Sequence, residues 1–111
     1  MSIKIAVLKS GDQLISDMKE LMAENEQKVQ AYMLVNPHTY EISEKQFMTE
    51  EEKEVGDYGI DVSLLPWIIL SKDKKMIIPT DSVLTVVEPL ESVTQLYLDK
   101  VGSFDMEEID D

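Results

Sequence analysis

The sequence has no cysteine, so disulfide bonds, thiolate metal sites and thiol nucleophiles are excluded. It has no arginine either, because all ten basic residues are lysine, and the planar guanidinium group that binds phosphate in bidentate fashion is missing. No apolar run approaches the length of a membrane span, and the N-terminal MSIKIAVLK becomes polar too early for a signal peptide. We expect a soluble cytoplasmic protein with no membrane partner.

The sequence also shows no recognisable motif for a metal site, a cofactor site or a catalytic site. The single histidine, His38, offers neither a metal-ligand set nor a catalytic dyad. The contiguous acids at 50–52 lack the alternating spacing of calcium loops, and no phosphate-binding loop or activated-nucleophile motif is present. The prediction is a protein that is not an enzyme, with no catalytic residue, no metal, no cofactor and no small-molecule substrate.

The charge is strongly negative but unevenly distributed. Of the formal net charge of −13, residues 41–57 and residues 99–111 each carry −5. The rest of the chain therefore carries only −3, so its acidity does not by itself exclude a nucleic-acid partner. From the length we predict one domain over 1–102, with an acidic insertion at 43–59, partly disordered or forming a short helix, and an acidic tail at 103–111.

Most of the body alternates apolar and polar residues in short runs bounded by turn residues, which predicts strands. The runs are 3–9 before a Gly11-Asp12 turn, 29–35 and 39–42 around a bulge or bend at 36–38, 60–71, and 76–78 with 83–87 around a corner at 79–81. Residues 60–78 fit either one long bent strand or a hairpin. Residues 13–22 fit a helix slightly better than a strand. From 90 to 101 the apolar period becomes helical, and Gly102 is the expected exit.

Two segments resemble the signatures of Sm-like proteins. IAVLKSGDQLIS is similar to the first signature, in which a strand ending in Leu-x-x-Gly leads into a second, strongly bent strand. IPTDSVLTVV is similar to the second, with Pro79 and Thr80 where that family has Arg and Gly; Ser16 stands where the family has a second glycine. The resemblance favours a strand at 13–22. It covers about half of the chain and is closest to divergent members encoded by phages, which would place the protein in a host cytoplasm.

The resemblance implies a small, strongly bent, five-stranded antiparallel Sm-like barrel with a short C-terminal helix. Such subunits pair the fifth strand of one copy with the fourth of the next, which implies a closed cyclic homo-oligomer. The expected interface residues are Met76, Ile77, Ile78, Val83, Leu84, Val86 and Trp67. The implied function is an RNA-binding or RNA-regulatory scaffold, with Asn25, Asp81, Ser82, Lys72, Lys74 and Lys75 as candidate RNA contacts. The alternative is a ring-forming phage or host protein-interaction module without nucleic-acid binding, which the absence of arginine favours.

Overall fold

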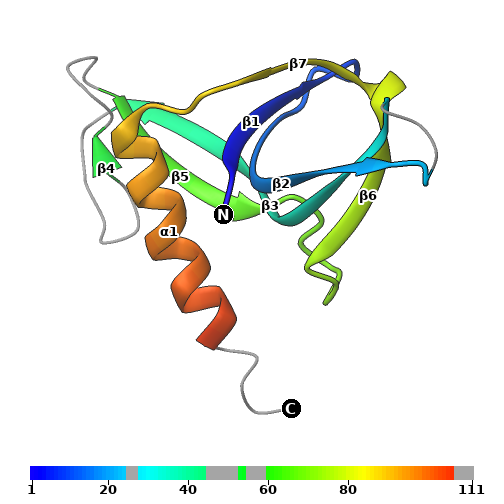
Figure 1. Cartoon of the computed structure of the whole chain (residues 1–111). Helices are drawn as coiled ribbons and strands as arrows, with labels where there is room; N and C mark the ends of the chain where they lie inside the picture. Colours follow the sequence, from blue (N-terminus) through cyan, green and yellow to red (C-terminus); the bar gives the residue numbers. More distant parts are fainter. Residues whose placement is uncertain (25–27, 45–52, 55–59, 107–111) are drawn as a thin grey trace. The chain divides into compact units, whose positions relative to one another are not determined.

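The computed structural model describes residues 1–24, 28–44, 53–54 and 60–106. These residues are mostly β-strand with one C-terminal helix, as predicted (Figure 1). In chain order the elements are β1 (Ile3–Leu8), β2 (Gln13–Met22), β3 (Val29–Glu44), β4 (Lys53–Glu54), β5 (Ile60–Pro66), β6 (Lys75–Pro79), the 3-10 turn η1 (Thr80–Ser82), β7 (Val83–Val87) and α1 (Glu91–Met106).

The strands form one sheet that is not closed into a barrel. Its order is β4-β5-β3-β2-β1-β7, with β6 beside β3 off this path, and the pairs whose register is known are antiparallel. The prediction of a five-stranded Sm-like barrel is therefore wrong in strand number, and the sheet does not form a barrel. The physical reason is the length of β3, whose 16 residues have room for both β5 and β6.

The first two strands form a hairpin, so the strand predicted at 13–22 is confirmed. Gly11 has a positive φ of 97°, which a side-chain-bearing residue rarely adopts, and the Leu8 N–H donates to the Asp12 carbonyl oxygen at 2.8 Å. The helical spacing of apolar residues in β2 is overridden because Leu14, Ile15 and Ser16 are all buried in succession. A strand covered on both faces buries neighbouring residues, which weakens the alternation that sequence reading depends on.

The interruption predicted at 36–38 is a β-bulge in β3. Ile15 pairs with His38 and Asp17 with Val35, so β3 has one residue more than β2 between these pairs. Asn36 takes a positive φ of 53°, a conformation that asparagine tolerates better than most residues. The bulge explains why the strand continues through Pro37.

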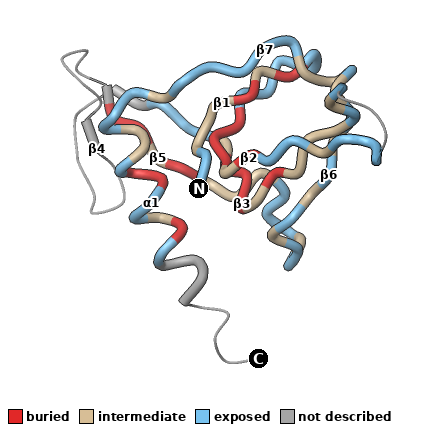
Figure 2. The backbone as a smooth tube through the Cα atoms, viewed as in Figure 1, coloured by how far each residue is buried: buried red, intermediate tan, exposed pale blue. Residues whose placement is uncertain are grey.

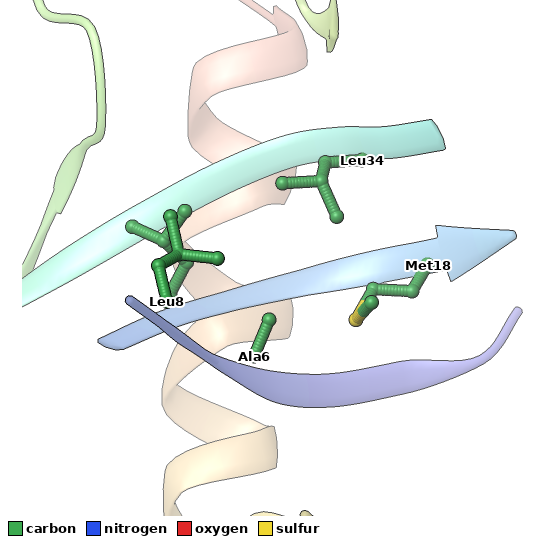
Figure 3. Close-up of a cluster of buried hydrophobic side chains, with 5 residues drawn as sticks. Ala6, Leu8, Met18 and Leu34 are labelled. Atoms are coloured by element: carbon green, nitrogen blue, oxygen red, sulfur yellow. The ribbon is translucent and has the colours of Figure 1, made fainter. Parts of the chain in front are cut away.

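The chain divides into two compact units, and the first comprises Met1–Thr39 and Pro66–Pro89. Its core is a cluster of buried apolar side chains from β1, β2 and β3, four of which are labelled in Figure 3. The cluster consists of Ala6, Leu8, Leu14, Met18 and Leu34, and the half-buried Tyr32, Trp67, Ile78 and Val83 pack against it. The core therefore draws on β6 and β7, which lie far from β1 in the sequence.

The second unit comprises Tyr40–Leu65 and Leu90–Asp111. Of the face predicted for the helix, Tyr97 and Val101 are buried, whereas Leu90 and Leu98 are exposed. Leu96 is buried as well and was not predicted. The prediction that the helix ends at Gly102 is wrong, because α1 continues to Met106. Gly102 keeps a negative φ, and a glycine in an exposed helix costs only about 1 kcal/mol.

The structure also describes parts of the acidic insertion, residues 60–78 and the acidic tail. Residues 60–78 form neither one strand nor a hairpin, because β5 and β6 are separate strands that both pair with β3. Much of the acidic insertion at 43–59 lies outside the described residues. Its described part is strand rather than helix, since 43–44 end β3 and Lys53 pairs with Val62. Of the tail, 107–111 lie outside the described residues, and 103–106 belong to α1.

Candidate functional site

The corner between β6 and β7 is built by local hydrogen bonds. Pro79 ends β6 with an extended backbone, and its carbonyl oxygen accepts from the Ser82 hydroxyl at 2.7 Å. The Val83 N–H closes η1 by donating to the Thr80 carbonyl oxygen. The Lys9 N–H donates to the Ser82 carbonyl oxygen at 2.9 Å and ties the corner to the end of β1. The corner is therefore fixed on the first unit (Figure 1).

Among the described residues, each of the two strands joined by this corner has one strand neighbour. β6 pairs with Ala31–Val35 of β3, and β7 pairs with β1. In the described part of the chain, the opposite edges of β6 and β7 therefore present backbone N–H and C=O groups to no other strand.

The side chains of these two strands are unusually exposed for apolar residues. In β6 the pattern alternates, with Met76 and Ile78 half-buried and Ile77 66% exposed. In β7 only Val83 is half-buried and packs on the core, while Leu84 is 64% exposed. Figure 2 shows β7 as predominantly exposed, and its other exposed apolar residues are Val86 and Val87. We call the outer edges of β6 and β7 the corner edges.

The candidate RNA contacts do not form one cluster. Lys72, Lys74 and Lys75 lie before or at the start of β6, while Asp81 and Ser82 lie beyond its end. Four steps along a strand separate Lys75 from Pro79, which is about 13 Å. The Ser82 hydroxyl already donates to a backbone carbonyl within the corner. Asn25 lies outside the described residues.

Trp67 and His38 have structural environments. Trp67 is half-buried against the core cluster, so its indole is not an exposed stacking platform. His38 is buried, and its Nδ1 donates to the Asn36 carbonyl oxygen at 2.8 Å within the bulge. In the ranges that the structure describes, no group of three or more His, Asp or Glu side chains is arranged to hold a metal ion.

Sequence reading missed the exposed turn that follows Pro66. It treated 60–71 as one apolar run, but β5 ends at Pro66 and the next residues turn. Ile68, Ile69 and Leu70 are all exposed. The available signals were Pro66, which cannot donate to a ladder, and the polar SKDKK that follows directly.

In the part of the chain that the structure describes, the protein is a mostly antiparallel β-sheet with a C-terminal helix, and its two corner edges pair with no other strand. The chain belongs to the DUF6561 family, a family of unknown function whose model matches residues 1–102. No curated protein matches the sequence. Among the described residues, no helix has the length and apolar character needed to cross a membrane.

Proposed function

We propose that this chain assembles with copies of itself through the corner edges, β6 of one copy pairing with β7 of the next, and that the resulting ring is a protein-interaction scaffold. The observation that carries this proposal is that the two strands joined by one corner each have exposed apolar side chains and an edge that pairs with no other described strand. The resemblance to Sm-like proteins supports the same pairing, because their fourth and fifth strands join neighbouring copies.

The composition of β7 supports a paired role for its outer edge. Soluble proteins usually protect an edge strand with charges, proline or a bulge. The five residues VLTVV contain no charge and no proline, although Leu84 is the extra residue of a β-bulge, because Val7 pairs with Thr85 and Leu8 with Val83. A β-branched, uncharged edge of this kind favours pairing with another strand over exposure to water.

Energetic magnitudes favour closure over an open dimer. Burying the exposed parts of Ile77, Leu84 and Val86 gives roughly 2.5 to 5 kcal/mol, since full burial of such a side chain is worth about 1.5 to 3 kcal/mol. Association costs about 4 kcal/mol or more in lost freedom of motion, so one contact alone is marginal. A head-to-tail contact that closes into a ring gives every copy two such contacts.

RNA binding by the ring is the second candidate. It is supported by Lys72, Lys74 and Lys75, the only local group of lysines in the sequence. Against it stand the net charge of −13, the absence of arginine, and the distance between these lysines and the corner. The protein-interaction scaffold is therefore preferred.

Sedimentation equilibrium at micromolar concentration tests the assembly. We expect a species several times the monomer mass, and we expect Leu84→Lys to reduce it to a folded monomer by placing a charge on the edge. Met22→Lys is the matched control, because Met22 is also exposed but belongs to β2, which β3 separates from β6. A well-folded wild-type monomer at this concentration would defeat the proposal.

Binding of a labelled RNA oligonucleotide across a salt series separates the two candidates. Phosphate contacts must weaken as the salt concentration rises. Tight, salt-sensitive binding that is lost on replacing the three lysines by glutamine would establish the RNA candidate. Absence of binding at low salt by an assembled ring would eliminate it and leave the scaffold.

A further inference from the structure

The connection between β5 and β6 contains a tight turn with an apolar tip. The Ser71 N–H donates to the Ile68 carbonyl oxygen at 3.1 Å, which closes a four-residue turn with Ile69 and Leu70 at its centre. Leu70 is 96% exposed and Ile69 66% exposed. Central turn positions usually hold Gly, Pro, Asn, Asp or Ser, so isoleucine and leucine here break the local rule without gaining burial. We call residues 68–71 the apolar turn.

The apolar turn is held firmly at its base. The Trp67 N–H donates to the Pro37 carbonyl oxygen at 2.9 Å, and the Asn36 N–H donates to the Lys74 carbonyl oxygen at 2.6 Å. Both partners belong to the bulge of β3. The Trp67 side chain packs on the core, and the Asp73 N–H donates to the Ser71 hydroxyl at 3.0 Å. These contacts fix the tip in one conformation, so binding through it would cost little ordering entropy.

The charge beside the apolar turn is opposite to that of the whole chain. Between Val62 and Thr80 the sequence has three lysines, at 72, 74 and 75, and one acid, Asp73, whereas the whole chain has a net charge of −13. Lys72 and Lys75 are exposed, and Lys74 is half-buried. An exposed apolar tip thus stands next to a locally basic stretch.

We propose that the apolar turn inserts into the surface of a lipid bilayer that contains anionic headgroups. Interfacial protein segments place apolar side chains at the acyl boundary and lysines at the headgroup phosphates. The exposed Ile68, Ile69 and Leu70, followed by lysines at 72, 74 and 75, have this composition.

A bilayer fits these residues better than a protein partner. Consecutive residues at the tip of a tight turn point apart, so they form a convex surface that would need a matching pocket on a protein. A bilayer deforms around such a tip and needs no pocket. The expectation of no membrane partner rested on the missing transmembrane span, and surface insertion does not need one. The surface of the bilayer also supplies a dense layer of phosphate for the three lysines.

The acidic residues elsewhere in the chain repel an anionic bilayer, so binding depends on the salt concentration. At physiological salt the screening length is about 8 Å, so distant carboxylates are screened while lysines in direct contact with headgroups are screened less. We expect binding at this salt to vesicles of phosphatidylcholine with phosphatidylglycerol, and at least tenfold weaker binding to phosphatidylcholine alone.

Vesicle co-sedimentation of the full chain tests the proposal. The variant Ile69→Ser/Leu70→Ser should bind at least tenfold more weakly, while Met22→Ser, which also replaces an exposed apolar residue, should bind like the wild type. Lys72→Gln/Lys75→Gln should lose the preference for anionic vesicles. Trp67 is the only tryptophan, so its fluorescence emission should shift to the blue on binding. The Ile69→Ser/Leu70→Ser variant lies outside β6 and β7, so a loss of vesicle binding in this variant is distinguishable from a loss of ring assembly.

Two results would overturn the proposal. One is the absence of wild-type binding to anionic vesicles at millimolar lipid, which would assign the apolar turn to a protein partner. The other is an equal loss of binding in Met22→Ser and in the turn variant, which would mark the binding as unspecific.

Discussion

At the scale of single residues, most of the buried polar side chains lie in or beside the bulge of β3, and Asp61 does not. Ser16 is fully buried beside the bulge, and its hydroxyl donates to the Val35 carbonyl oxygen at 2.9 Å. Asn36 and His38 shape the bulge itself. Asp61, in β5, is 1% exposed, and among the described residues neither carboxylate oxygen has a hydrogen-bond partner. A buried polar group without partners opposes folding.

Replacing Asp61 with valine should therefore stabilise the protein. Valine is close in size, favours strands, and removes two unsatisfied oxygens, so we expect the free energy of unfolding to rise by about 1 to 3 kcal/mol. Urea denaturation followed by circular dichroism measures the change. Ser16→Ala serves as the contrasting variant, because it removes a satisfied buried hydrogen bond and should lower the same free energy. A loss of stability in Asp61→Val would mean that the carboxylate has a partner in the assembled protein.

At the scale of the elements, sequence reading succeeded where a local rule and the packing agreed. Gly11, the alternation of β1 and the proline-ended β6 were each sufficient to predict a strand or turn. The bulge was predictable from Asn36 and Pro37. Sequence reading failed where packing overrides local preference: in β2 the consecutive residues Leu14, Ile15 and Ser16 are all buried, and α1 continues past Gly102 to Met106.

The candidate site was predictable only in part. The corner was found because Pro79, Asp81 and Ser82 are turn residues between apolar runs. The exposure of β6 and β7 could not be predicted, because an apolar strand has the same sequence pattern in a core and at the edge of a sheet. The same ambiguity hid the apolar turn, since Ile68, Ile69 and Leu70 look like strand residues in sequence. The signals for a turn lie on either side of these residues, in Pro66 and in the polar SKDKK, and the Ser71 N–H to Ile68 carbonyl hydrogen bond closes it.

The two described glycines should respond oppositely to alanine. Gly102 lies in α1 with negative φ and open space around it, so Gly102→Ala should stabilise the protein by about 0.5 to 1 kcal/mol. Gly11 also has open space, but its φ of 97° is unfavourable for alanine, so Gly11→Ala should destabilise it. Thermal unfolding by circular dichroism compares the two. Equal effects would show that space rather than backbone conformation decides.

At the scale of the whole molecule, assembly and folding should be linked. If neighbouring copies cover the corner edges, only folded chains can assemble, so assembly stabilises the folded state. The urea midpoint should therefore rise with protein concentration. Leu84→Lys should abolish this dependence, and Met22→Lys should retain it. A wild-type midpoint that stays constant over a hundredfold range of concentration would contradict the linkage.

A ring would also multiply the effect of the apolar turn. Rotational symmetry places every copy of this turn at the same height along the ring axis, so tips that point along the axis would meet one bilayer together. Several weak contacts made together bind far more tightly than one. Vesicle binding by wild type should then exceed that of Leu84→Lys, although both chains carry the same turn.

The pairing of β1 with β7 has a consequence for the synthesis of the chain. Ile5 pairs with Val87, 82 positions later, so one side of the first strand made is completed by one of the last. While the ribosome is still translating the intervening residues, β1 and β2 can fold as a hairpin, but the other edge of β1 has no native partner. Contacts of such long sequence separation slow folding. The nascent chain therefore passes through a period in which β1 is open to wrong pairing, and chaperones or slow translation before β7 would affect its yield more than its final stability.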